Sequence, residues 1–238
     1  MKKMLFTTLA TVVFALANVA NAQSLKEVLD MNFKAVGQEK LVAANSYYVK
    51  AKMSQMGMEV PMEMKVKKPL MFVVTIEFQG QKLITAFDGE NGWMINPMAG
   101  PEPKDLSGDE LSQARQQADI EGELYNYEAK GHSAELLGKV NLDGKEMYRI
   151  KLTTKDGTSK DYFIDTKTNL ISKVKSKVTA QGQTVDVEQI MSDYKTIDGV
   201  TMAMKIEQKT PMGIGTIFME EFKMNESYDD SIFKKPTK

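Results

Sequence analysis

Residues 59–68 read EVPMEMKVKK, and apolar and polar side chains alternate strictly along this stretch. A strand with one buried and one solvated face has this period of two. The buried face would carry Val60, Met62, Met64 and Val66. Methionine is a notable choice there, because its flexible, polarizable side chain is common on surfaces that accept variable apolar partners. With 18 Met and no Cys in the chain, the sequence raises the question of what so much soft apolar surface binds.

The period of two recurs along most of the chain after one helix. Ser24 and Glu27 form a capping box that predicts a helix over residues 25–36, and Gly37 is a natural stop. Strands then follow one another through tight turns such as Asp143-Gly144. The pattern predicts a mainly β protein of the α+β class, with about 11 antiparallel strands in a sheet that must curl around something.

An insert over residues 104–130 interrupts the strands. Before it, residues 97–103 contain three prolines, which predict that the sheet does not continue there. Ser107 and Glu110 then make a second capping box. The following helix has only a thin apolar stripe, and a second short turn of helix is expected around Ile120 and Leu124. The insert is either a lid or a packing helix that closes one end of the sheet.

The N-terminus has the features of an export signal. Lys2 and Lys3 precede an apolar run over residues 5–19, and the small-x-small triplet Ala20-Asn21-Ala22 follows. We therefore expect residues 1–22 to be a cleaved signal peptide and residues 23–238 to be one periplasmic domain. The formal net charge of −1 gives no support to nucleic-acid binding. Without Cys, the fold has to rely on core burial rather than on disulfides.

Catalytic and metal-binding patterns are scarce. His132 is the single histidine and stands beside a glycine in an expected loop, and no nucleophile elbow or phosphate-binding glycine loop is present. Carboxylate-only catalysis stays an alternative, but no acid–base pair stands out, so no enzyme and no cofactor are predicted. Thioethers could bind Cu(I), yet Met62 and Met64 share their phase with valines, which favours an apolar face over a metal site.

Five segments together resemble one known family. They are KKPLMFVVTIEF (67–78), FDGENGWMINP (87–97), DYFIDTKTNLISKV (161–174), DYKTIDGV (193–200) and NESYDDSIFKKP (225–236). In this order and spacing they resemble the outer-membrane lipoprotein-sorting protein family, the LolA-like superfamily of periplasmic carriers. The resemblance implies a curved antiparallel incomplete (half) β-barrel, covered by the N-terminal helix and by the helical lid insert. It also implies an apolar cavity that holds lipid.

The function implied is that of a non-enzymatic, monomeric periplasmic carrier. It would bind acyl chains of lipoproteins or other lipids for sorting to the outer membrane, with inner- and outer-membrane sorting proteins as partners. The alternative is a sensor or scaffold domain of the same fold that binds a partner protein. The lid would contribute Leu111 and Ala114. The predicted cavity residues are Val60, Met62, Met64, Leu70, Phe72, Val74, Ile76, Trp93, Met94, Met202, Met204 and Phe218.

Two positions depart from the family's pattern. Carriers of this type have an arginine that latches the lid, on the strand after the Lys-Pro turn, and that place falls at Val73. A proline after the Asp-Gly-Val turn is replaced by Ala203. The first departure predicts a lid that is not held shut by that arginine.

Overall fold

The computed structural model describes residues 23–55, 57–180 and 183–237. The predicted signal peptide lies outside these residues. The helices are α1 (Leu25–Val36), α2 (Gln38–Ala43), α3 (Gly108–Gln117) and the short 3-10 helix η1 (Asp230–Phe233). The first strands are β1 (Ser46–Gln55), β2 (Met58–Lys67), β3 (Met71–Phe78), β4 (Gln81–Phe87), β5 (Gly92–Asn96) and β6 (Gly100–Asp105). The others are β7 (Ser133–Leu142), β8 (Lys145–Thr153), β9 (Ser159–Asp165), β10 (Ile171–Ala180), β11 (Gln183–Ile197), β12 (Val200–Thr210) and β13 (Gly213–Met224).

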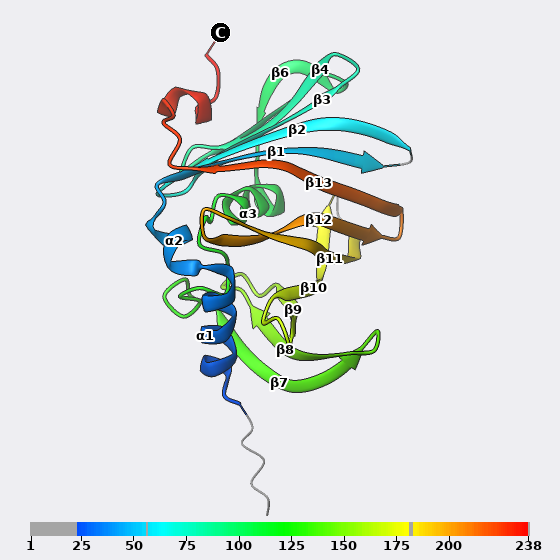
Figure 1. The fold of residues 1–238 in the computed structure, drawn as a ribbon. Helices are drawn as coiled ribbons and strands as arrows, with labels where there is room; N and C mark the ends of the chain where they lie inside the picture. Colours follow the sequence, from blue (N-terminus) through cyan, green and yellow to red (C-terminus); the bar gives the residue numbers. More distant parts are fainter. Residues whose placement is uncertain (1–22, 56, 181–182, 238) are drawn as a thin grey trace, which may run out of the picture.

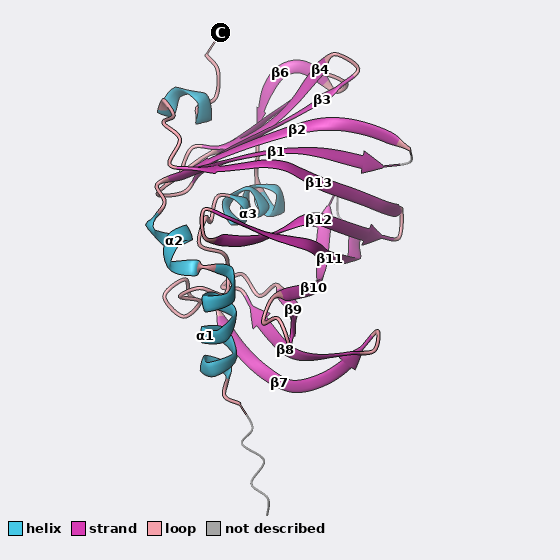
Figure 2. Ribbon diagram, in the orientation of Figure 1, coloured by secondary structure: helices cyan, strands magenta, loops and turns pink. Residues whose placement is uncertain are grey.

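All strands join in one open antiparallel sheet. In the described part of the chain this sheet has 13 strands in the order β6-β5-β4-β3-β2-β1-β13-β12-β11-β10-β9-β8-β7. The pairing of β1 with β13 brings the first and last strands together in the middle. Figure 1 shows the sheet curving around α3, with α1 alongside its lower half. The predicted class, a curved antiparallel sheet with a few helices that does not close into a barrel, is confirmed (Figure 2).

The stretch 59–68 forms β2 and has the two faces that its alternation predicts. Met64 pairs with Val49 of β1 and with Val74 of β3, so these three side chains share the concave face. Lys65 pairs with Tyr48 and Val73 on the convex face. Directly opposed residues in an antiparallel sheet lie on the same face, and these pairings therefore assign every neighbouring position along β1, β2 and β3.

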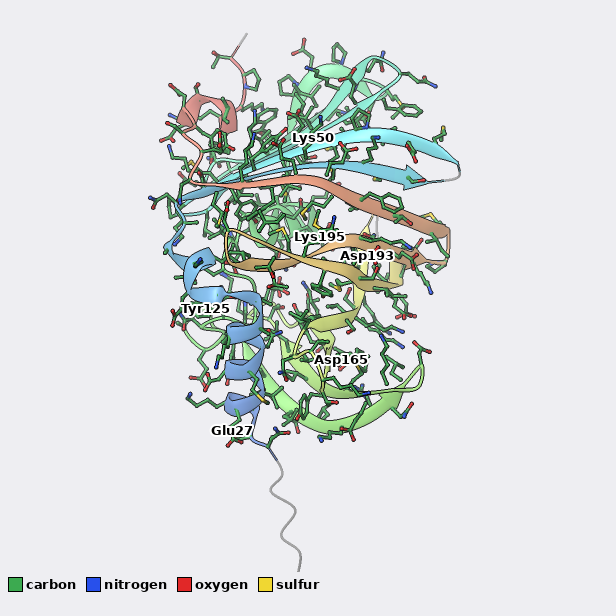
Figure 3. All side chains as sticks on the ribbon, in the orientation of Figure 1. Glu27, Lys50, Tyr125, Asp165, Asp193 and Lys195 are labelled. Carbon is green, nitrogen blue, oxygen red and sulfur yellow. The ribbon has the colours of Figure 1, made fainter. Side chains whose placement is uncertain are left out.

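Helix α1 begins and ends where the sequence predicts. The Ser24 hydroxyl accepts a hydrogen bond from the Glu27 amide, and the Glu27 carboxylate accepts one in return from the Ser24 amide at 2.7 Å. Glu27 lies at the free end of the helix in Figure 3. Gly37 ends the helix with φ at 73°, and an added Cβ would lie 2.1 Å from the carbonyl oxygen of Gly199. Glycine is required here both by backbone conformation and by this close approach. The short helix α2 that follows was not predicted.

Three local predictions around the insert are wrong. Residues 100–105 form β6 despite Pro101 and Pro103, because β6 is an edge strand, where a missing amide donor is tolerated. Ser107 is the N-cap of α3, but its side chain makes no capping hydrogen bond. The stretch after α3 consists of turns rather than a second short helix. The expected strand count was too low chiefly because β6 was missed.

The apolar core is divided into three clusters along the curved sheet, within the described residues. The first packs α1 against β8, β9 and β10, with Val28 and Ile150 fully buried. The second packs α3 and its flanks against β2, β3 and β4 around Phe72. The third lies between β1, β12 and β13 around Ala51. Each fully buried large side chain stabilises the fold by roughly 1.5–3 kcal/mol, so each helix is firmly seated on one part of the sheet.

The C-terminal segment, residues 225–237, crosses the convex face of the sheet near β3 and β5. Phe233 is fully buried, and its carbonyl oxygen accepts a hydrogen bond of 2.8 Å from the Trp93 indole N–H. Lys67 anchors the same segment by contacts with the Tyr228 carbonyl at 2.9 Å and the Asp230 carboxylate at 2.5 Å. The segment therefore covers apolar surface on the side of the sheet away from α3.

Candidate functional site

A cavity of about 820 Å³ lies on the concave side of the sheet, between α3, α1 and the strands. Its volume is within the range of roughly 300–1,000 Å³ that is typical of small-molecule sites. It reaches from β1 and β13 in the middle of the sheet to β9 and β10 in the lower half. Its existence follows from the layout of the core, because α3 fills only the half of the concave face that lies over β2 to β5.

The floor of the cavity is apolar and contains flexible side chains. Met64, Met202 and Met219 line it from three strands, together with Val49 and Phe222. A wall of thioethers and a phenyl ring can deform around an apolar chain at small cost. The mouth is different in character, since the lining residues from α3 are all polar and the loop after it adds Asp119, Glu121 and Glu123 beside the apolar Ile120 and Leu124.

The lid segment (residues 104–130) is fixed on one side by apolar contacts. Leu106, Ala114, Ala118 and Ile120 are buried in the same cluster as Phe72. The concave surface of β2 to β4 around Phe72 is therefore covered by the lid segment and is part of a closed core. Because these apolar side chains are buried, the lid segment is attached firmly on the side of β2 to β5.

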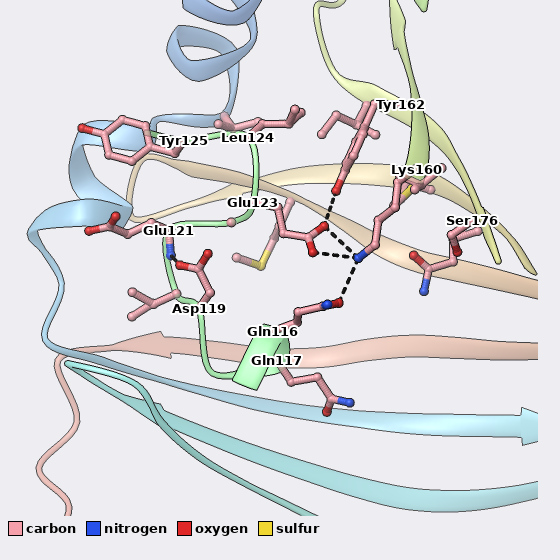
Figure 4. Close-up of a pocket in the computed structure, with 18 of the residues that line it drawn as sticks. Gln116, Gln117, Asp119, Glu121, Glu123, Leu124, Tyr125, Lys160, Tyr162 and Ser176 are labelled. Atoms are coloured by element: carbon pink, nitrogen blue, oxygen red, sulfur yellow. Dashed lines mark hydrogen bonds and ion pairs between the residues drawn. The ribbon is translucent and has the colours of Figure 1, made fainter. Parts of the chain in front are cut away.

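On the other side the lid segment is held by polar contacts, and Figure 4 shows those of Lys160 with Glu123 and Gln116 and that of Tyr162 with Glu123. The Glu123 carboxylate lies 2.8 Å from the Lys160 ammonium on β9 and accepts a hydrogen bond of 2.6 Å from Tyr162. Lys160 also donates to the Gln116 side chain at 3.1 Å. Ser112 of α3 donates to the Asp156 carboxylate at 2.8 Å. The cavity is thus spanned by a segment with an apolar attachment at one end and a polar one at the other.

Burial keeps two phenols of the cavity neutral. Desolvation raises the pKa of Tyr162 well above its ordinary value, and the adjacent Glu123 carboxylate raises it further. The pKa of Tyr47 is likewise raised, first by burial and then by the charge of Asp119. Both residues line the cavity. They therefore present hydroxyl groups, not phenolates, across the whole physiological range.

The structure places the predicted cavity residues in several different surroundings. Met64 and Met202 line the cavity. Met62 packs in the third cluster, and Met204 is half-buried on the same side of β12 as Met202. The closed second cluster contains Leu70, Phe72, Val74 and Met94 together with the lid residues Leu111 and Ala114. Val60 and Ile76 lie half-buried further out along β2 and β3. The helix α3, seated on this half of the sheet, covers the four predicted cavity residues of the second cluster.

Trp93 and Phe218 lie on the convex face and do not line the cavity, contrary to prediction. Trp93 pairs with Ala86 and is covered by the C-terminal segment. Phe218 pairs with Lys52 and Lys205, and 40% of its surface is exposed. β13 has an extra residue, Glu220, opposite Lys50 and Ala51 of β1, and alternation alone does not reveal the change of face that this bulge causes.

The position assigned to the latching arginine, Val73, also faces away from the lid segment. Its partners in the sheet are Lys65 and Ala86, both on the convex face. A longer side chain at this position would not reach α3. The contacts of Lys160 and Asp156 hold the lid segment instead. No periodic pattern indicates them, because they depend on pairing between distant segments.

Several lining residues were not anticipated as part of a site. They are the apolar residues Tyr47, Val49, Val174, Val187, Met191, Met219 and Phe222 and the glutamines Gln113, Gln116, Gln117, Gln189 and Gln208. The alternation of Tyr47 and Val49 was a usable signal for the apolar part. The thin apolar stripe of α3 was the corresponding signal for the glutamines, because a helix with little apolar surface leaves a polar face toward the cavity.

Gly92 sets the distance between α3 and the sheet. An added Cβ would lie 2.9 Å from Leu111 Cδ1 and 3.0 Å from Leu106 Cδ1. We expect Gly92→Ala to lower the free energy of unfolding by about 1–2 kcal/mol, because the lid segment has to shift outward. Urea unfolding measures the loss, and hydrogen exchange of residues 108–117 locates it. Gly215→Ala is the matched control, since nothing lies within 4 Å of its added Cβ. Equal exchange of α3 in both variants would contradict the prediction.

The contact between Ser112 and Asp156 makes the lid segment sensitive to acid. Hydrogen bonds from Thr154 and then from Ser112 hold the pKa of Asp156 below its ordinary value of 3.8. A carboxyl group whose pKa is lower in the folded protein stabilises the fold at every pH above its ordinary pKa. This stabilisation is lost as the pH falls through the lowered pKa. We expect the hydrogen-exchange protection factors of the α3 amides to decrease once the pH is lower than about 3.8. Asp156→Asn should flatten this drop, and an unchanged drop in that variant would count against the contact as its cause.

The described residues contain neither a candidate membrane-spanning helix nor a candidate metal site. No helix there has the length and apolar character needed to cross a membrane. No group of three or more His, Asp or Glu in the same residues is arranged to hold a metal ion.

The chain is similar to solved structures although its sequence matches no family model. No protein-family model matches the chain, and no curated protein matches its sequence. Solved structures do match over most of its length. A DUF1329 family protein from Desulfovibrio piger is 14% identical with a TM-score of 0.61, covering 87% of this chain and 97% of that one. A LolA superfamily protein from Nitrosomonas europaea is 14% identical with a TM-score of 0.59, covering 90% and 99%.

A third solved structure has the same arrangement. It is described as an outer membrane lipoprotein-sorting protein domain from Vibrio parahaemolyticus, and it is 12% identical with a TM-score of 0.57, covering 87% of this chain and 97% of that one. At identities this low the likeness concerns the fold and not the ligand. Together with the open curved sheet and the helix on its concave side, these matches lead to one conclusion: the chain has a divergent LolA-like fold.

Proposed function

We propose that this protein is a non-enzymatic carrier that binds acyl chains of lipoproteins or other lipids in the cavity beneath α3. The observation that carries the proposal is the cavity itself, with an apolar, methionine-containing floor and a volume of about 820 Å³. A single acyl chain gains roughly 0.8 kcal/mol for each buried methylene, so an apolar floor of this kind favours long chains. The fold shared with a lipoprotein-sorting domain supports the same proposal.

The asymmetric attachment of the lid segment suggests how cargo enters. The apolar attachment over Phe72 would act as a hinge, while the contacts of Ser112 and Glu123 with Asp156 and Lys160 would break and re-form. Water can replace the partners of these polar groups once the segment moves, whereas lifting the apolar attachment would expose hydrocarbon, so the polar side opens at the lower cost. Met64 and Met202 are the predicted residues that we retain as cargo contacts.

The N-terminal sequence supports a place of action in the bacterial envelope. Lys2 and Lys3, the apolar run and the triplet ending at Ala22 are typical of a cleaved export signal. We propose a periplasmic monomer that takes cargo from the inner membrane and delivers it to a receptor at the outer membrane.

Lipid content after export tests the proposal. The protein is produced with residues 1–22, purified from a bacterial periplasm without detergent, and measured by native and denaturing mass spectrometry. We expect a mass in the native spectrum that exceeds that of the chain by a stoichiometric acylated species, which extraction then identifies. A protein without adduct that also fails to bind added phospholipid and acylated peptide would overturn the carrier and favour the partner-binding alternative.

A further inference from the structure

The charges around the cavity are arranged unevenly. In the described part of the chain its lining contains five carboxylates, Asp109, Asp119, Glu121, Glu123 and Asp156. The cations of the lining, within the described residues, are Lys160 and Lys177. A lipid with a phosphate head would have to place its charge among these groups, so the state of each cation decides whether phosphate is accepted.

No described lysine of the lining offers a free charge to the cavity. Lys160 lies 2.8 Å from Glu123, and the two side chains are only 18% and 12% exposed. The Lys177 side chain is 73% exposed and lies 4.0 Å from Asp186, with which it pairs across the convex face. A buried cation that already has a carboxylate partner gains little from a second anion, because that anion would also face the carboxylate.

The two lysines behind the lid segment are also occupied. Lys130 lies 2.7 Å from Asp119 and 3.9 Å from Glu121. Lys68 lies 3.9 Å from the same Glu121 carboxylate. These pairs neutralise the acidic residues after α3, and they leave neither lysine available to a negatively charged head.

Two carboxylates of the lining remain without an ion-pair partner among the described residues. Asp156 is held by the hydroxyl groups of Thr154 and Ser112 and by backbone hydrogen bonds. Asp109 lies with Glu110 in the first turn of α3, where the helix N-terminus would otherwise attract an anion. Any phosphate that entered at the mouth would therefore meet negative charge that no neighbouring lysine offsets.

Uncharged polar groups are plentiful at the same place. Gln113 and Gln117 line the cavity from α3, and Gln189, Gln208 and Ser176 line it from the strands opposite. Carboxamides both donate and accept hydrogen bonds, and so they match hydroxyl, ester and amide groups of a neutral head. In Figure 4, Gln117 lies below the contacts between the lid segment and β9, and Ser176 lies to their right.

We propose that the cavity selects lipids whose head is uncharged, such as an acylglycerol or the diacylglyceryl group of a lipoprotein, and rejects lipids with a phosphate head. This inference rests on the proposed carrier function and specifies its cargo. The excess of unpaired carboxylate at the mouth, together with lysines that are already paired, excludes phosphate, while the glutamines bind the neutral head. Such selection would keep the cavity from filling with phospholipid, the most abundant acylated molecule near a membrane.

A matched pair of ligands tests the selection. A monoacylglycerol and the lysophosphatidic acid with the same acyl chain differ only in the phosphate. Each is titrated, below its micelle concentration, against the mature protein loaded with the neutral dye N-phenyl-1-naphthylamine. We expect the monoacylglycerol to displace the dye at about tenfold lower concentration in low salt, and the difference to shrink as salt is added.

The carboxylates are then changed without changing side-chain size. Asp109→Asn combined with Asp156→Asn should reduce several-fold the difference between the concentrations at which the two ligands displace the dye. The control Asp186→Asn changes a side chain that is 84% exposed and should leave that difference unchanged. Equal displacement by both ligands in low salt, or better displacement by lysophosphatidic acid, would overturn the selection while leaving the carrier function in place. Failure of both ligands to displace the dye would overturn the carrier function as well.

Discussion

Met202→Asp is expected to abolish lipid loading while the protein stays folded. Met202 lies half-buried on the floor of the cavity, where an acyl chain would surround the new carboxylate and remove it from water. An unpaired buried charge costs roughly 3–5 kcal/mol, which corresponds to at least a hundredfold loss of affinity. Without ligand, water in the cavity can solvate the carboxylate, so the fold should lose much less. The acylated adduct in native mass spectra is the measurement.

The chain offers a control with the same change of side chain. Met212 lies in the turn between β12 and β13 and is 75% exposed, so Met212→Asp should retain the adduct. Met202→Leu should retain it as well, since volume and polarity are nearly conserved. Full loading of a folded Met202→Asp protein would mean that the cargo does not lie on this floor.

A disulfide across the polar side of the lid segment is expected to stop cargo exchange. Ser112 and Asp156 already touch through their side chains, at 2.8 Å, and the chain contains no Cys of its own. In the double variant Ser112→Cys/Asp156→Cys, oxidation with diamide would join α3 covalently to the turn before β9. Exchange of a bound fluorescent lipid should then slow by roughly a hundredfold or more, because the segment can no longer swing away from that turn.

Reduction of the same sample provides the internal control. Dithiothreitol should restore exchange to the rate of the unoxidised protein, and either single Cys variant should exchange at that rate with or without diamide. If the oxidised double variant, shown by mass to contain the bond, exchanges lipid normally, then cargo does not pass beneath this side of α3.

Much of the sheet could be read from local patterns. The alternation in EVPMEMKVKK gave both faces of β2, and the capping box at Ser24 gave the start of α1. These features depend on residues within one or two turns of chain. The strand β6 was missed because its prolines exclude a central strand, and nothing local shows that it lies at an edge.

The candidate site was less accessible to sequence reasoning. Alternation identified Phe72 as inward-facing, yet it could not show that α3 covers this residue and leaves Met219 open to the cavity. The bulge at Glu220 in β13 likewise reversed the expected face of Phe218. The contact of Glu123 with Lys160 joins residues 37 positions apart, which only the folded chain brings together. Closed core and open cavity consist of the same residue types and differ only in what lies above them.

The open sheet also affects how molecules of this protein interact with one another at high concentration. A sheet that does not close keeps two edges, here β6 and β7, and a bare edge can template the strands of a neighbouring molecule. In β6, Pro101 and Pro103 have no amide hydrogen to offer such a neighbour. In β7, the register shifts between Leu136 and Lys139, so the edge is bent. Edges of this kind resist intermolecular strand pairing, and the protein can therefore retain an open sheet at high concentration without growing into fibrils.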